Sequence, residues 1–321
     1  MSAGETGAHQ SGPPEAEAVG HGTRRAIFAA FLANLGIAVA KFAAFLITGS
    51  ASMMAESIHS VADTGNQGLL FLGGKRAKKP ADAAHQFGYG SERYFWAFVV
   101  ALVLFSLGAL FSLYEGIQKL SHPHDLESPA VAFLVLGVAA VLESLSLRTA
   151  IHESQPHRHG LSWWQFIRKT KLPELPVVLL EDVGALFGLI FATIGLGLAV
   201  ITDETRFDAI GSIAIGLLLG AIAVVLAIEM KSALIGESAL PRVDASIRAA
   251  ITAGPEVRRV IHLRTLQLGP DDVLVATKLD IDAPDIAGLA RAIDTIEVRI
   301  RAAVPTARLI YIEPDLYRSD A

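Results

Sequence analysis

Six apolar stretches, each long enough to form a helix across a lipid bilayer, constrain this chain more than any other feature. A helix needs about 20 residues to cross roughly 30 Å of hydrocarbon. The composition agrees with a bilayer environment, because 52% of the residues are hydrophobic and only 18% are charged. The sequence therefore predicts an α-helical membrane protein with six transmembrane helices. The stretches cover residues 25–47, 52–74, 93–118, 129–151, 175–201 and 209–233.

The second stretch is the least apolar of the six. An amphipathic helix lying on the membrane surface is the alternative interpretation. The stretch has a face of small residues and no basic stripe, which favours a span. The polar residues that interrupt it are Glu56, His59, Asp63, Asn66 and Gln67.

Basic residues gather in alternate connections between the stretches. Lysine and arginine are enriched in the cytoplasmic connections of membrane proteins. Both termini are therefore predicted to be cytoplasmic, in a multi-pass protein of the inner (cell) membrane. The enriched connections carry Arg24, Arg25, Lys75, Arg76, Lys78, Lys79, Arg158, Arg168, Lys169 and Lys171, whereas the opposite ones carry only Lys119 and Arg206 near the membrane.

The chain divides into three parts. Residues 1–23 are rich in Gly, Ala, Glu, Ser and Pro and are predicted to be a disordered tail. Residues 24–236 form the transmembrane domain, and residues 237–321 form a small cytoplasmic α+β domain. Its predicted order is α-β-β-α-β, with two helices on one face of a three-stranded sheet. The elements are a helix over 242–253, strands over 257–267 and 273–282 joined by a turn at 269–272, a helix over 286–303 and a strand over 307–313.

Charge and cysteine content exclude several classes of function. The formal net charge of −5 leaves no basic footprint for a nucleic-acid partner. The chain has no cysteine, which excludes disulfide frameworks and thiolate metal sites. A bound metal ion must therefore be held by oxygen and nitrogen atoms.

Ionisable side chains inside the spans are the strongest functional candidates, because burying them in lipid costs several kcal/mol unless they are paired or hydrated. His59 and Asp63 lie four residues apart, on one helix face. Such a pair could grip a metal ion from one side, and Glu181 and Asp182 in the fifth span could complete the site. The alternatives are a buried hydrogen bond that fixes helix packing and, for a single Asp, a proton relay.

Other polar positions leave their roles open. Asp208 and Asn34 are interpreted as packing or capping residues, whereas Glu56 and Glu143 remain ambiguous. Lys41 lies deep in the first span, where it could pair with an acid, snorkel or act in gating. In the loop after the second span, Asp82 and His85 could chelate an ion or simply tie down the loop. A tract with His152, His157 and His159 is interpreted as a solvated loop rather than a metal collector.

Several segments resemble the cation diffusion facilitator family of divalent-metal/proton antiporters, over roughly residues 24–315. SASMMAESIHSVADTGNQ is similar to the family's second-span signature, and PADAAHQFGYGSERY to the loop that follows it. LRTLQLGPDD and YIEPD are similar to parts of its cytoplasmic domain. The second and fifth spans are most similar to the branch with the animal mitochondrial zinc transporters.

The resemblance implies a transport site with two ligands from the second span, His59 and Asp63, and two from the fifth. The fifth-span pattern is His or Asp, three residues, then Asp, so Asp182 matches its second member. Val178 occupies the first and cannot coordinate a metal. Glu181 lies about 60° around the helix from position 178, and we hypothesise that it is a substitute ligand. This harder ligand set would admit Mn²⁺, Fe²⁺ or Co²⁺ alongside Zn²⁺.

Two further metal sites of the family are altered here. Asp82 and His85 match its loop site, whereas Tyr89 stands where His is common. The domain after the spans is therefore expected to serve mainly as a homodimer interface, without a full binuclear site. The positions that bind metal in the family's domain fall here on Ile261, Thr277 and Tyr311, which leaves Glu313, with His262 as a further candidate.

The expected function is efflux of a divalent cation, foremost Zn²⁺, in exchange for protons by alternating access. The expected partners are the metal ion, protons, the lipid bilayer and a second copy of the chain, with no prosthetic group. The alternative is a membrane metal sensor that binds ions without moving them. An intramembrane metalloenzyme is disfavoured, because no His-Glu-x-x-His motif is present.

Overall fold

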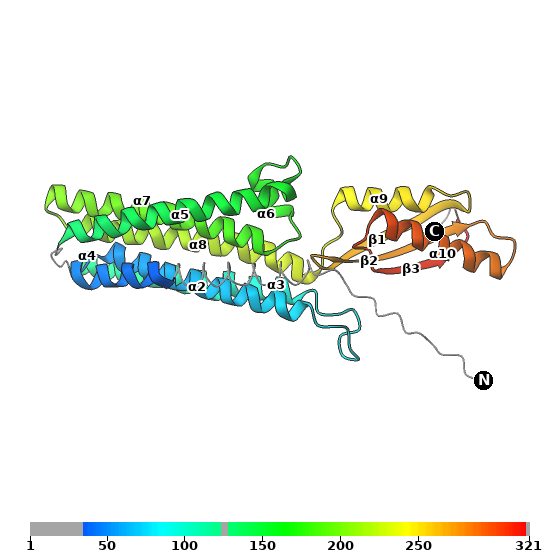
Figure 1. Cartoon of the computed structure of the whole chain (residues 1–321), viewed down its shortest axis with the longest axis horizontal. Helices are drawn as coiled ribbons and strands as arrows, with labels where there is room; N and C mark the ends of the chain where they lie inside the picture. The colour runs from blue at the N-terminus through cyan, green and yellow to red at the C-terminus, as the bar shows by residue number, and fades with distance from the viewer. Residues whose placement is uncertain (1–34, 123–127, 319–321) are drawn as a thin grey trace, which may run out of the picture.

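The computed structural model describes residues 35–122 and 128–318 of the chain. The predicted tail, residues 1–23, lies outside the described residues, as does Asn34. A helical bundle and a small α/β domain lie end to end along the long axis of the molecule (Figure 1).

Among the described residues, four helices are long and apolar enough to cross a membrane, judged by length and composition. They coincide with the third to sixth predicted stretches. The first of them is continuous over Glu92–Ser121 and contains a π-helical stretch, Val100–Phe105, between α3 and α4. A short helix, α6, precedes the third of them. The bounds are α3 Glu92–Val99, α4 Ser106–Ser121, α5 Pro129–Arg158, α6 Trp163–Lys169, α7 Glu174–Thr202 and α8 Arg206–Ile235.

The first two predicted stretches correspond to different kinds of helix. The second forms α2 (Ala51–Ala77), whose 27 residues span about 40 Å at 1.5 Å per residue. This length is sufficient to cross a bilayer. The polar residues of α2 lower its hydropathy, so it is not one of the four apolar helices. The first is described only from Leu35, where an apolar helical segment continues to Thr48.

Glycine allows the bundle helices to approach closely. A Cβ atom at Gly116 of α4 would lie 2.8 Å from the carbonyl oxygen of Ala209 in α8. A Cβ atom at Gly216 of α8 would lie 2.9 Å from the carbonyl oxygen of Ala109 in α4. The two backbones are therefore in contact, and small residues permit this approach. Gly116 and Gly216 therefore serve the packing of α4 against α8.

Large apolar side chains cover the outside of the bundle, whereas polar side chains lie within it. This is the reverse of a water-soluble bundle and suits a lipid environment. The outward-facing residues include Leu134, Val141, Ile201, Leu217 and Val224. The buried polar residues include Lys41, Glu56, His59, Asp63, Asn66, Glu181 and Asp182.

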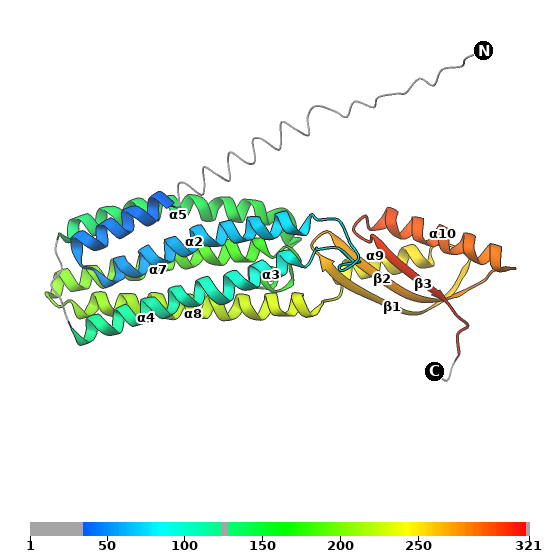
Figure 2. The ribbon, with the colours of Figure 1, turned by 90° about the horizontal axis from the view of Figure 1, so that it is seen from below.

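The C-terminal domain has the predicted element order. β1 and β2 form an antiparallel hairpin, and β3 joins the other edge of β2 in parallel. Buried residues of α9 and α10 share one core with alternate residues of β2, so both helices cover the same face of the sheet (Figure 2). This confirms the two-layer prediction. The elements are α9 Pro241–Thr252, β1 Val257–Gly269, β2 Asp272–Ile281, α10 Ile286–Ala303 and β3 Leu309–Pro314.

The tip of the β1–β2 hairpin contacts the end of the bundle. Gly90 packs against Gly269 so closely that a Cβ atom at Gly90 would lie 2.8 Å from the carbonyl oxygen of Leu268. Arg93 of α3 forms a two-pronged ion pair with Glu174 of α7, at 2.5 and 2.9 Å, and also contacts Asp271 in the hairpin at 3.2 Å. Arg93 therefore joins α3 both to α7 and to the turn of the hairpin.

Candidate functional site

One face of α2 is polar over three turns and lies inside the bundle. Glu56, His59, Asp63 and Asn66 recur at intervals of three or four residues, which places them in one stripe. Each is at most 5% exposed. Neighbouring polar groups must compensate this burial, because lipid offers no hydrogen bonds.

The N-terminus of α2 is fixed by polar contacts. Ser50 caps the helix by accepting a hydrogen bond from the N–H of Met53. The buried carboxylate of Asp208 in α8 accepts hydrogen bonds from the Ser50 hydroxyl and the N–H of Ala51, both at 2.7 Å. Lys119 of α4 lies 3.4 Å from the same carboxylate. The prediction that Asp208 is a capping or packing residue is confirmed.

The buried amine of Lys41 has two partners on α2. It donates hydrogen bonds to Glu56 at 2.8 Å and to the Ser60 hydroxyl at 2.9 Å, and the lysine and glutamate side chains are fully buried. Of the roles left open for Lys41, the structure shows pairing with an acid. The Glu56 carboxylate lies against Gly188 of α7, where a side chain at position 188 would collide with it.

His59 and Asp63 form the predicted pair one turn further along α2. The imidazole Nδ1 lies 3.4 Å from Oδ1 of Asp63, with both side chains almost fully buried. Neither His59 Nε2 nor Asp63 Oδ1 has a hydrogen-bond partner among the described residues. Unpartnered buried acceptors are costly and unusual, which makes each a candidate ligand atom.

The two predicted acids of α7 face different neighbours. Glu181 accepts a hydrogen bond from the Asn66 amide of α2 at 3.3 Å. Asp182 accepts one from the Ser146 hydroxyl of α5 at 2.9 Å, and its second oxygen is unpartnered among the described residues. Successive residues of a helix point about 100° apart, which accounts for the divergence. Val178 packs in apolar clusters.

The structure therefore brings the predicted ligands together only in part. His59 and Asp63 are adjacent, and Glu181 reaches the same stripe of α2 through Asn66. Asp182 belongs to the boundary between α7 and α5. Among residues 35–122 and 128–318, no three His, Asp or Glu side chains converge in a metal-binding geometry.

Two residues at this site were not among the predicted site residues. Asn66 connects α2 to Glu181, and its position three residues after Asp63 places it on the same helix face. That spacing was a usable signal. Ser146 contacts Asp182 from another helix, and nothing in its local sequence distinguishes it from a packing residue.

The predicted loop residues form a local turn outside the bundle. The Asp82 carboxylate accepts hydrogen bonds from the N–H groups of Ala84 and His85 and from the Tyr89 hydroxyl, the last at 2.6 Å. These bonds, led by that of Tyr89, lower the pKa of Asp82. His85 Nδ1 lies 3.6 Å from the same carboxylate. The contacts favour the interpretation that these residues tie down the loop.

Two of the C-terminal positions that the family uses for metal make contacts within the domain. The Thr277 hydroxyl donates to the carbonyl of His262 at 3.0 Å. Glu313 forms an ion pair with Lys278 at 3.0 Å. Thr277 and Glu313 therefore both make contacts within the domain, and the absence of a full binuclear site stays a prediction.

Comparison with known proteins gives one family and several relatives. The cation efflux transmembrane domain matches residues 27–235. Human mitochondrial proton-coupled zinc antiporter SLC30A9 is 34% identical over 244 residues, which is 75% of this chain and 43% of that protein. Metal tolerance protein C4 of Arabidopsis thaliana is 34% identical over 221 residues, 67% of this chain and 48% of that protein. Magnetosome protein MamB of Magnetospirillum gryphiswaldense is 26% identical over 288 residues, 87% of this chain and 89% of that protein.

The lengths of these relatives differ. This chain spans less than half the length of the human and Arabidopsis proteins that it matches, but most of the magnetosome protein. The family match covers the helical bundle and ends where α8 ends, at Ile235.

Proposed function

The chain belongs to the cation efflux family, and from this premise we propose that it exports a divalent metal cation in exchange for protons by alternating access. Family membership confirms three expectations from the sequence: an integral membrane protein, a transporter rather than an enzyme, and likeness to the branch that contains the mitochondrial zinc antiporters. We propose Zn²⁺ as the foremost cargo, with Mn²⁺, Fe²⁺ and Co²⁺ as alternatives.

The observation that carries the proposal is a set of buried, unpartnered acceptor atoms around α2 and α7. His59 Nε2, Asp63 Oδ1 and Asp182 Oδ2 lack hydrogen-bond partners among the described residues. In the described part of this region, five carboxyl groups are buried against one buried ammonium, that of Lys41. A divalent cation would partner these acceptors and offset the negative charge. The acids are Glu56, Asp63, Glu143, Glu181 and Asp182.

The proposed ligands are His59, Asp63 and Glu181, with Asp182 as the fourth. Glu181 already reaches the polar stripe of α2 through Asn66 at 3.3 Å. Asp182 would have to leave Ser146 to join them. For this, α7 would have to rotate about its own axis relative to α2, and relative movement of these helices is what alternating access requires.

Proton coupling follows from the chemistry of the ligands. Carboxylates and imidazole must be deprotonated to hold a metal ion, so binding a metal releases protons and taking up protons releases the metal. In an exporter, the compartment that receives the metal would then supply the protons that displace the ion.

The remaining features of the proposal concern topology and assembly. We propose six spans, with α2 and the helix containing Leu35–Thr48 as the first two, a three-part division at residues 23 and 236, and cytoplasmic termini in the inner membrane. The 27-residue length of α2 and the inward orientation of its polar face support a span. We also propose a homodimer joined through the C-terminal domain.

The test is metal-driven proton flux in proteoliposomes. Wild type and Asp82→Ala, which removes a carboxylate outside the bundle, should both couple metal uptake to proton movement. Asp63→Ala and Asp182→Ala should abolish it. Unchanged transport in both bundle variants would overturn the site. Tight metal binding by the wild type with no metal movement would favour the sensor instead.

A further inference from the structure

α5 carries one exposed stripe whose chemistry changes along its length. Positions 134, 138, 141, 145, 148, 152 and 155 follow each other at intervals of four and three residues, so they lie on one helix face. All seven are exposed. The first four are apolar, and the last three are polar or basic. They are Leu134, Val138, Val141, Leu145, Arg148, His152 and Gln155.

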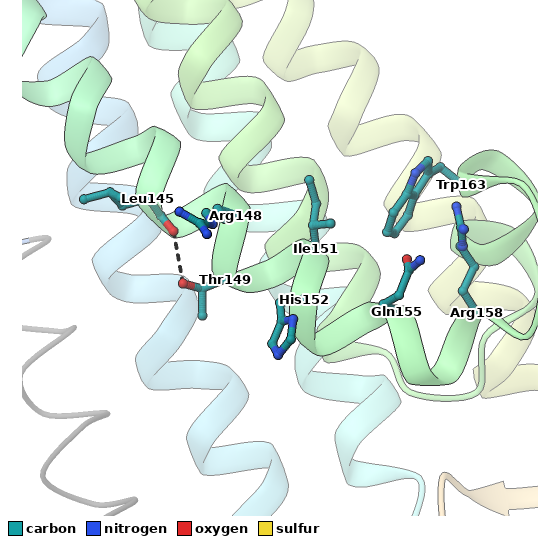
Figure 3. A pocket seen from close by; sticks show the side chains of 8 residues that line it. All are labelled: Leu145, Arg148, Thr149, Ile151, His152, Gln155, Arg158 and Trp163. Carbon is teal, nitrogen blue, oxygen red and sulfur yellow. Dashed lines mark hydrogen bonds between the residues drawn. The ribbon is translucent and has the colours of Figure 1, made fainter.

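The basic part of this stripe forms one wall of a groove of about 800 Å³ (Figure 3). The groove is lined by Arg148, His152, Gln155 and Arg158 of α5, together with Trp163. The Arg158 side chain extends over the Trp163 ring, with its guanidinium carbon 4.7 Å from the ring centroid. The lining contains no acidic residue, and neither arginine forms an ion pair with any described residue.

The groove lies at the end of the bundle that adjoins the C-terminal domain, where α5 leaves the apolar region (Figure 1). Trp163 and Trp164 follow α5 at the start of α6, and tryptophan is enriched at the boundary between lipid and water. The apolar part of the stripe lies N-terminal to the groove on α5. From Leu134 to Leu145 it rises about 16 Å along the helix axis. That length matches roughly half of the 30 Å hydrocarbon layer.

We propose that this groove binds the phosphate headgroup of an anionic phospholipid, whose acyl chain lies along the apolar part of the α5 stripe. Two guanidinium groups and an imidazole provide the donors that a phosphodiester requires. The adjoining aliphatic side chains provide an exposed surface one leaflet long. This site is separate from the proposed metal ligands and does not depend on the transported ion.

A second copy of the chain is a poorer occupant. A protein partner would have to supply acids to meet the two arginines, and the stripe itself supplies none to a symmetric copy. Free phosphate would satisfy the arginines but would leave the apolar stripe without a role. The continuity of the basic and apolar parts favours a ligand with both an anionic head and an apolar tail.

The test compares lipid binding to the purified full-length protein by native mass spectrometry. Phosphatidylglycerol should be retained over phosphatidylcholine in wild type, and Arg148→Gln/Arg158→Gln should weaken its binding by at least about tenfold, since each charge-assisted hydrogen bond to the phosphate contributes roughly tenfold or more. The matched control is Lys75→Gln/Lys169→Gln. It removes the same charge at the same end of the bundle, outside the groove, and should change binding by less than about twofold. Equal losses in both double variants would overturn a specific site.

A second measurement locates the lipid and separates the other occupants. Because the chain has no cysteine, Thr149→Cys provides a single labelling position in the groove. A fluorophore there should be quenched by phosphatidylglycerol with a spin label near its headgroup, and not by the matching phosphatidylcholine. Full protection from quenching by millimolar inorganic phosphate would assign the groove to free phosphate. Disulfide-linked dimers of the unlabelled Thr149→Cys variant in vesicles would assign it to a second copy.

Discussion

The two helices that form the proposed metal site are held in different ways. α2 is fixed at its N-terminus by Asp208 and along its polar face by Lys41, so His59 and Asp63 sit on a braced helix. α7 carries its acids side by side in sequence, and they face different helices. This difference would suit a carrier. The fixed ligands of α2 can hold the ion, while movement of α7 determines how many of its acids also coordinate it.

The largest expected effect concerns the buried ion pair between Lys41 and Glu56. Lys41→Met would leave the Glu56 carboxylate buried without its partner, which costs about 3–5 kcal/mol in comparable cases. We expect a steep loss of thermal stability of the purified protein. Lys41→Met/Glu56→Gln should recover most of it, since the uncompensated charge is removed. If the double variant is no more stable than the single one, the ion pair is not what braces α2.

The next effect concerns the ligands on the braced helix. Asp63→Asn keeps the shape of the side chain but removes the charge that would hold a divalent ion. We expect metal affinity to fall by about 100-fold or more, because changes to residues that only support a ligand already cost 10–100-fold. Isothermal titration with Zn²⁺ measures this. His85→Ala is the control, and an equal loss there would move the site to the loop.

A smaller effect is expected at the contact between Asp182 of α7 and Ser146 of α5. Ser146→Ala removes the hydrogen bond that holds Asp182 away from α2. If Asp182 must leave Ser146 to reach the metal, the substitution should leave metal affinity unchanged or raise it by a few fold. Ser144→Ala, which removes an exposed hydroxyl two residues away on α5, is the matched control. A large loss of affinity in Ser146→Ala alone would mean that Asp182 binds metal while it contacts α5.

The smallest effect concerns the loop. The Tyr89 hydroxyl is the main cause of the lowered pKa of Asp82. A lowered pKa means that the ionised carboxylate stabilises the loop at neutral pH and that this contribution is lost as pH falls below about 4. Tyr89→Phe should shift that loss to higher pH, seen as earlier cleavage of the loop by pepsin during acidification. Identical cleavage profiles would show that the bond does not hold the loop.

Much of the fold could be predicted from the sequence because its signals are periodic. The strands and helices of the C-terminal domain alternate or repeat regularly, and their predicted ends lie within a few residues of the observed ones. The pairing of His59 with Asp63 was equally predictable, since a spacing of four places two side chains on one face in any helix.

The rest of the site depends on tertiary packing. Lys41 and Glu56 come from different helices, so their ion pair follows from how those helices pack and not from either segment alone. The division between Glu181 and Asp182 depends on the rotation of α7 about its own axis. That rotation is set by close contacts such as Gly188 against Glu56, which no local pattern in the sequence encodes.

The most direct test of a metal site shared between α2 and α7 is a metal-competition uptake assay on proteoliposomes that contain wild type or Glu181→Ala. If Glu181 replaces the ligand missing at Val178, Glu181→Ala should weaken uptake by about tenfold or more. The loss should be larger for Mn²⁺ than for Zn²⁺, because the harder ion depends more on carboxylate oxygen. Uptake and metal preference equal to wild type would contradict this account and leave the site with three protein ligands.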